Sequence, residues 1–122
     1  MSNELTIAAS MSYNKNGKRR TLSVSGQQVD VTGDGYIDNS QDVGFAAHEA
    51  LVLGEVATPG WASFKNCDDT NYVQIGIDDG GTFEPFVKLL AGEETGPMRL
   101  AGAPYAQANT GAVILSYIIV EA

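Results

Sequence analysis

The stretch Asp30–Asp38 has the spacing of oxygen ligands that a calcium loop requires. Asp30, Thr32, Asp34 and Asp38 stand at positions 1, 3, 5 and 9 of the EF-hand or dockerin pattern, and a glycine stands at position 6. Oxygen atoms are the ligands that Ca²⁺ prefers, so side chains at this spacing could surround one cation.

The end of the calcium pattern argues against tight binding. Position 12 should carry a bidentate carboxylate, but this chain has Gln41 there, and the acid Asp42 comes one residue late. No long helix flanks the loop. We therefore expect an acidic loop between strands and no resident metal, with calcium binding kept as the alternative.

His48 and Cys67 are the only histidine and the only cysteine. A catalytic dyad would need a third, orienting group and an oxyanion site, and no motif marks either. A single cysteine excludes an intrachain disulfide and gives no zinc spacing. The acid pairs Asp68–Asp69 and Asp78–Asp79 fit solvated turns better than a glycosidase pair. We expect no catalytic site and no cofactor.

The charges are unevenly distributed along the chain. Residues 1–20 carry four bases against one acid, a net charge of +3, and residues 21–122 carry three bases against fourteen acids, a net charge of −11. An acidic body argues against nucleic acid as a partner. The basic cluster is either a solvated hairpin tip or a contact for an acidic neighbour. Its members are Lys15, Lys18, Arg19 and Arg20.

Length and composition indicate one globular domain over residues 1–122. The hydrophobic content is 43% and the charged content is 18%, which is typical of a chain with a packed core. No apolar run approaches the roughly 20 residues that span a bilayer, so we expect no membrane partner. The first ten residues lack the pattern of a signal peptide.

The first part of the chain predicts a β-hairpin. Apolar residues alternate with small polar ones from Leu5 to Tyr13, which indicates a strand with one buried face. Asn16-Gly17 is the typical pair of a type I′ turn. A return strand is expected over Thr21–Ser25, and after a break at Gly26 a further short strand over Gln28–Thr32.

Further strands, turns and loops are predicted between residues 33 and 111. The expected strands are a short extended segment over Asp42–Phe45, a brief strand over Leu51–Leu53, a central hairpin pairing Trp61–Cys67 with Tyr72–Ile77, a strand over Thr82–Leu90 and a short strand over Met98–Leu100. The expected connections are a polar loop over Gly33–Ser40, a bend over Ala46–Ala50, a turn over Ala91–Pro97 and a loop over Gly102–Gly111. Asp68–Asn71 should form the turn of the central hairpin. Pro85 cannot donate a ladder hydrogen bond, so the strand that contains it should lie at a sheet edge.

The last predicted strand, Ala112–Val120, is apolar on both faces. Such a strand lies between layers or has one face covered by another subunit. We expect either this strand or the basic cluster to form the subunit interface. The candidate residues are Lys18, Arg19, Arg20, Ile114, Leu115, Tyr117, Ile118 and Val120.

Nine or ten short strands with frequent turns predict an all-β fold, an antiparallel β-sandwich of jelly-roll type. A small barrel is the rival architecture.

Residues 57–76 also carry a resemblance to a known family. The chain contains ATPGW, FKN and DTNYVQIG, and the pattern is similar to TPGW-x-x-x-KNLD-x-TNYVEIG of small virion structural proteins of tailed bacteriophages. The resemblance covers roughly residues 40–122 and extends to the closing YIIVEA. Cys67 stands where Leu is usual, and Gln74 stands where Glu is usual.

This resemblance implies a non-enzymatic component of the virion, assembled in the host cytoplasm. It leaves open a capsid decoration or cement protein, a neck component and a tail component. The implied partners are the major capsid protein or neck and tail proteins, together with further copies of the chain. A calcium- or carbohydrate-binding module is the alternative, based on Asp30–Asp38 and on Trp61 or Tyr72 as exposed aromatic residues.

Overall fold

The computed structural model describes residues 4–122, which belong to two compact units. The first unit ends at Thr32 and the second runs from Gly33 to Ala122. All strands in the described residues belong to antiparallel sheets. The predicted all-β class is therefore confirmed.

The first unit is a β-hairpin of β1 (Leu5–Lys15) and β2 (Lys18–Val29). Lys15 pairs with Lys18, so Asn16 and Gly17 alone form the turn. Their φ angles of 52° and 76° are the positive values that a type I′ turn requires. The predicted turn is confirmed.

The second strand of this hairpin is longer than the sequence predicts. A break was expected at Gly26, but β2 runs through it. Between the pairs Ile7–Gln27 and Ala9–Val24, β2 holds one residue more than β1, which makes a β-bulge. Gly26 has a φ of 67°, which glycine adopts without steric cost. It therefore bends the strand instead of ending it.

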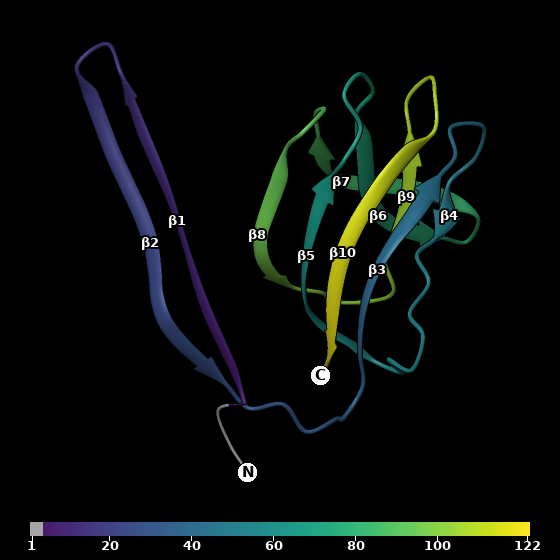
Figure 1. The fold of residues 1–122 in the computed structure, drawn as a ribbon, viewed down its shortest axis with the longest axis horizontal. Helices are drawn as coiled ribbons and strands as arrows, with labels where there is room; N and C mark the ends of the chain where they lie inside the picture. Colours follow the sequence, from purple (N-terminus) through teal and green to yellow (C-terminus); the bar gives the residue numbers. More distant parts are fainter. Residues whose placement is uncertain (1–3) are drawn as a thin grey trace. The chain divides into compact units, whose positions relative to one another are not determined.

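The second unit contains eight strands in two packed sheets (Figure 1). They are β3 (Tyr36–Val43), β4 (Glu49–Ala50), β5 (Pro59–Asn66), β6 (Val73–Asp79), β7 (Thr82–Leu89), β8 (Glu94–Arg99), β9 (Tyr105–Ala108) and β10 (Val113–Glu121). One sheet, called the β10 sheet below, has the order β3-β10-β5-β8. The other, the β6 sheet, has the order β4-β9-β6-β7.

The pairing of these strands follows one rule. The first four pair with the last four in reverse order: β3 with β10, β4 with β9, β5 with β8 and β6 with β7. A long antiparallel hairpin rolled around a core gives this pairing, and the contacts β10–β5 and β6–β9 complete the two sheets. This is a jelly roll. The predicted sandwich of jelly-roll type is confirmed, and the barrel alternative is wrong.

The core lies between the two sheets and follows the period-2 alternation of strands. Every second residue of β10 is buried, as are the residues that face it from the β6 sheet. The most deeply buried core residues include Val43, Leu51, Phe64, Val73, Ile75, Leu89, Val113, Leu115, Tyr117 and Ile119.

The prediction that Pro85 lies in an edge strand is confirmed. β7 is the outer strand of the β6 sheet, and its pairing with β6 shifts register between Ile75 and Gly76. A Cβ atom on Gly76 would lie 2.1 Å from the carbonyl oxygen of Glu84. Only glycine fits this close approach of two backbones.

The predicted central hairpin is wrong. β5 and β6 lie in different sheets, so the turn between them crosses from one layer to the other. The turn has the expected chemistry, because the Asp68 carboxylate accepts hydrogen bonds from the backbone N–H groups of Thr70 and Asn71, at 3.0 and 2.6 Å. The same local hydrogen bonds can form in a hairpin turn and in a turn that joins two sheets. They therefore do not determine whether β5 pairs with β6.

Two strands stand where the sequence predicts loops. β3 occupies part of the predicted polar loop, since Asp38, Ser40 and Asp42 alternate with inward residues and face outward. β9 lies in the predicted loop over 102–111, where Ala106 and Ala108 are buried. The bend predicted after Phe45 is present, but the strand that follows it is Glu49–Ala50, not Leu51–Leu53.

Candidate functional site

The residues of the predicted calcium loop belong to two different units. Asp30 and Thr32 lie in the first unit, and Asp34 and Asp38 lie in the second. Asp38 is an exposed residue of β3 instead of a loop ligand. Within residues 4–122 no group of three or more His, Cys, Asp or Glu side chains is placed to hold a metal ion.

Glu121 organises the backbone around Gly35. Its carboxylate accepts hydrogen bonds from the N–H groups of Gly35, at 2.9 Å, and Ala57, at 3.0 Å. A Cβ atom on Gly35 would lie 2.8 Å from the carbonyl oxygen of Glu55. The glycine that matches position 6 of the calcium pattern therefore serves this close approach. The bonds from Gly35 and then Ala57 lower the pKa of Glu121 below its ordinary value.

This depressed pKa predicts that the contribution of Glu121 to stability depends on pH. A carboxylate whose pKa is lowered on folding contributes stability above its unfolded pKa, and the contribution is lost as the pH falls through the folded pKa. Glu121→Gln should therefore be less stable than the wild type at pH 7, and the difference should shrink as the pH falls below about 4.3, the ordinary pKa of a glutamate in an unfolded chain. Urea titrations at pH 7, 4 and 3 measure this. A difference that is independent of pH would contradict the assignment.

Calcium is expected to leave the stability of the chain unchanged. A ligand at a hundred times its Kd adds about 2.7 kcal/mol, which would raise the Tm by several degrees in a domain of this size. A thermal scan with and without millimolar calcium chloride tests the point. A rise of several degrees that Asp34→Ala abolishes would restore the calcium-binding alternative.

His48 and Cys67 contact different sheets. His48 Nε2 lies 2.8 Å from an Asp78 carboxylate oxygen, and its ring stacks on Phe83 at 5.2 Å between centroids. Cys67 Sγ lies 3.4 Å from the hydroxyl of Ser116 in β10. The structure thus pairs the histidine with an acid of β6 and does not bring it to the cysteine. The acid in turn orients the ring between Phe83 of β7 and Tyr105 of β9.

Trp61 and Tyr72, the aromatic residues considered for sugar binding, each have a cation over one ring face. The Arg99 guanidinium lies 5.5 Å from the Trp61 ring centre, and the Lys88 amine lies 4.2 Å from that of Tyr72. Both side chains are only partly exposed. These contacts make the rings part of the local packing.

The outer face of the β10 sheet is an exposed apolar surface. Ile114 and Ile118 remain 44% and 42% exposed although β10 is a central strand. Val120 is partly buried on the same face, and its partner Tyr36 is exposed. This surface is called the β10 outer face below.

Two of the predicted interface residues do not reach this surface. Leu115 and Tyr117 are 0% and 3% exposed because they point into the core. The Tyr117 hydroxyl is also occupied, since it donates a hydrogen bond to the carbonyl oxygen of Val52 at 2.7 Å. They are corrected to core residues, whereas Ile114, Ile118 and Val120 stay candidates.

The hairpin of the first unit carries another exposed apolar surface. Met11 pairs with Leu22, and both are exposed, at 71% and 61%. Tyr13 and Val24 lie on the same side by register and are exposed too. This surface is called the hairpin stripe below. Within the two-stranded hairpin itself, no second layer covers this part of the face that the sequence predicts to be buried.

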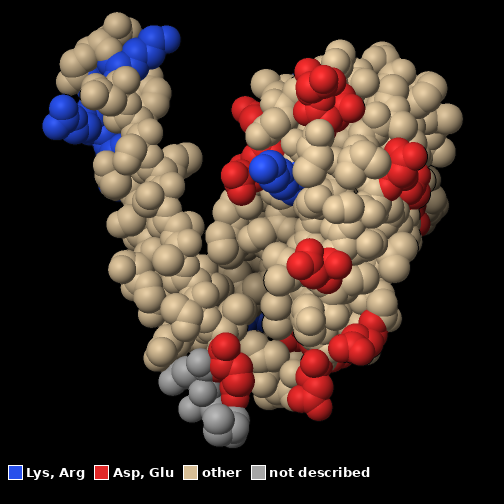
Figure 2. Space-filling model, in the orientation of Figure 1, with Lys and Arg blue, Asp and Glu red and all other residues tan. Residues whose placement is uncertain are grey.

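The basic cluster lies at the tip of the hairpin, as the sequence predicts. Lys15 and Lys18 flank the turn, and Arg19 and Arg20 follow in β2. Figure 2 shows these basic side chains gathered at the hairpin tip, while acidic side chains are spread over the visible face of the sandwich. The same pattern holds in the sequence: residues 33–122 carry thirteen acids against three bases, a net charge of −10.

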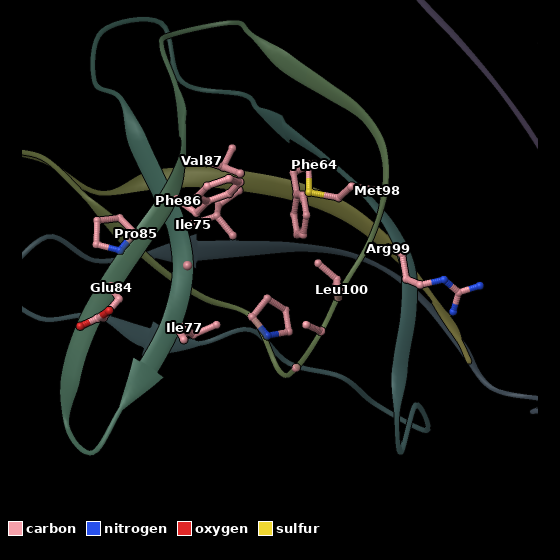
Figure 3. A pocket seen from close by; sticks show the side chains of 14 residues that line it. Phe64, Ile75, Ile77, Glu84, Pro85, Phe86, Val87, Met98, Arg99 and Leu100 are labelled. Carbon is pink, nitrogen blue, oxygen red and sulfur yellow. The ribbon is translucent and has the colours of Figure 1, made fainter. Parts of the chain in front are cut away.

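A groove at the edge of the sandwich was not predicted. It has a volume of about 530 Å³ and lies between β6 and β7 on one side and β8 with residues 100–104 on the other (Figure 3). Phe64, Ile75 and Met98 line it, and Phe86 at its margin is 94% exposed. Its lining includes no Ser, Cys or His, so the groove suits contact with an apolar group more than chemistry. An aromatic residue beside a proline in an edge strand was the only signal for it in the sequence.

Asn66 is a buried structural residue that the sequence pattern did not predict. It is 0% exposed, and its amide donates to the carbonyl oxygens of Asn71 and Leu89 and accepts from the N–H of Asp68. It therefore holds the turn that joins the two layers. Its bonds indicate that the FKN segment of the sequence, which contains it, specifies the fold.

The described residues contain no helix with the length and apolar character needed to cross a bilayer. Comparisons of the chain with protein families, with curated proteins and with solved structures find no match.

Proposed function

We propose that this chain is a non-enzymatic structural subunit of a tailed-phage virion, assembled in the host cytoplasm. Among the places in the particle, we favour a capsid decoration or cement protein over a neck or tail component. Its partners would be the major capsid protein, or neck and tail proteins, and further copies of itself.

The observation that carries this proposal is the exposed apolar surface in the middle of a completed sheet. Ile114 and Ile118 lie on a strand with hydrogen-bonded neighbours on both sides, so their exposure is not the fraying of an edge. Apolar side chains at such a position are stabilised when a second surface covers them. A small, acidic jelly roll with an uncovered apolar face on a central strand suits a protein that binds to a larger assembly.

The resemblance of residues 57–76 to virion proteins adds independent support. The motif spans β5, the turn between layers and part of β6. It includes Asn66, whose side chain bonds hold that turn. A chain that shares these residues is expected to share the jelly roll, and the proposal extends this to a shared place in the particle.

The composition of purified particles tests the proposed function. Mass spectrometry of virions from the phage that encodes the chain should find it in many copies per particle. Cryo-electron microscopy should then locate a jelly roll of this size on the capsid, neck or tail. Expression during infection without incorporation into particles would contradict the proposal.

A further inference from the structure

The hairpin of the first unit needs a covering surface. An isolated two-stranded hairpin is marginally stable in water, and the hairpin stripe leaves Met11, Tyr13, Leu22 and Val24 exposed. Covering these side chains would stabilise the hairpin by removing their apolar area from water. The covering surface should therefore be apolar along its length.

The charge of the hairpin indicates that the covering surface carries acidic side chains as well as apolar ones. Residues 1–32 contain only two acids, Glu4 and Asp30, and both flank the Leu5–Val29 pair at the open end of the hairpin. The basic cluster lies ten residues away along β1, about 33 Å in an extended strand. The tip is therefore not neutralised within its own unit, and an acidic partner would attract it.

The β10 outer face has both properties. Ile114 is paired with Asp42 and Ile118 is paired with Asp38 across the β10–β3 ladder, so the two acids lie beside the two apolar side chains on one face. Both aspartates are exposed, and β3 carries no base. On the opposite flank, Lys65 stands next to Glu94 in the β5–β8 ladder. The acidic side of this face is thus the β3 side.

We propose that the hairpin of one copy of this chain docks on the β10 outer face of a second copy. The hairpin stripe covers Ile114 and Ile118, and the basic cluster lies against Asp38 and Asp42. The lengths agree, since the nine residues of β10 extend about 30 Å. The proposal rests on the assembly in many copies described above, and it names the two surfaces that make the contact.

This contact joins two different surfaces, so it is heterologous. Each copy keeps a free hairpin and a free face, and repetition of the contact gives a ring or an open chain of subunits. Part of the attraction is between exposed charges, so it should weaken as the salt concentration rises.

Two charge reversals test the contact with purified protein. The tip variant carries Lys18→Glu, Arg19→Glu and Arg20→Glu, and the face variant carries Asp38→Lys and Asp42→Lys. All five side chains are exposed, so both variants should fold, which circular dichroism checks. Each variant alone should associate at least about tenfold more weakly than the wild type in sedimentation experiments, because like charges then meet.

Mixing the two variants should restore the association. The acidic tip of the tip variant then meets the basic face of the face variant, and the basic tip of the face variant meets the acidic face of the tip variant. The variant Asp79→Lys with Glu84→Lys is the matched control for the face variant. It makes the same change of net charge as the face variant, but on the β6 sheet, and it should associate like the wild type. A wild type that stays monomeric at millimolar concentration would overturn the proposal. So would variants that associate normally, or a mixture that does not recover.

A disulfide crosslink gives a second reading that does not depend on charge. In a Cys67→Ser background, chains with Leu22→Cys and chains with Ile118→Cys should form mixed crosslinked dimers when oxidised together. Leu22→Cys mixed with Asp79→Cys is the control. Equal crosslinking in the two mixtures would contradict docking on the β10 outer face. Failure of these purified-protein tests would leave the virion assignment standing, because that assignment is tested by particle composition.

Discussion

Leu115→Asp is expected to unfold the sandwich, whereas Ile114→Asp should leave it folded. The two residues are neighbours in β10, but Leu115 is 0% exposed in the core and Ile114 is 44% exposed on the outer face. An aspartate at position 115 loses the burial of a leucine and places a carboxylate among apolar side chains, a cost of about 5 kcal/mol or more. That cost is comparable with the whole stability of a domain of this size.

Far-UV circular dichroism and urea titration of both variants measure this difference. Ile114→Asp should keep its unfolding midpoint close to that of the wild type and lose self-association. Ile114→Ala is the matched control, because it removes apolar area from the outer face without adding a charge. Equal destabilisation by both aspartates would mean that β10 is buried on both faces.

Asn66→Ala is expected to destabilise the sandwich by about 3–5 kcal/mol. The substitution leaves the carbonyl oxygens of Asn71 and Leu89 and the N–H of Asp68 without their present partner. A buried backbone group that loses its partner costs about 1–3 kcal/mol. Urea titration at pH 7 gives the change in the free energy of unfolding.

Asn66→Asp separates the donor function of this side chain from its acceptor function. An aspartate at position 66 can still accept the hydrogen bond from the N–H of Asp68. Its second carboxylate oxygen, however, takes the place of the amide nitrogen that donates to the carbonyl oxygens of Asn71 and Leu89, so three acceptors face one another without a donor. It should therefore be at least as destabilising as Asn66→Ala at neutral pH. A stability close to that of the wild type for either variant would show that the turn between layers does not depend on this network.

Local signals in the sequence predicted the parts of the fold that depend on single residues. Asn16-Gly17 identified the hairpin turn because few other pairs adopt two positive φ angles. Pro85 identified an edge strand because it lacks an N–H. The apolar run ending at Val120 identified the strand β10, although its outer face is exposed in the sandwich instead of lying between two layers.

Pairing over longer distances could not be predicted in the same way. The bonds of Asp68 specify a turn but not whether the next strand stays in the same sheet. β3 was missed because its alternation places Asp38 and Ser40 on the outer face, which resembles a polar loop. β9 was missed because the buried Ala106 and Ala108 have little strand propensity of their own.

Of the candidate surfaces, the sequence predicted those that depend on local signals and missed those that depend on how distant strands pair. The position of Arg19 and Arg20 at the hairpin tip follows from the turn before them. In β10 both faces are apolar, so the pattern alone could not show that Leu115 points inward and Ile114 outward. The groove depends on β6, β7 and β8 meeting at one edge, which only the topology determines.

The accessibility of position 118 in assembled particles tests the central claim most directly. Virions carrying Ile118→Cys in a Cys67→Ser background can be labelled with a maleimide and compared with the isolated subunit at low concentration. If the β10 outer face is the contact that holds the subunit in the virion, labelling in particles should be slower by at least about tenfold. Equal labelling rates in particles and in the isolated subunit would contradict the account.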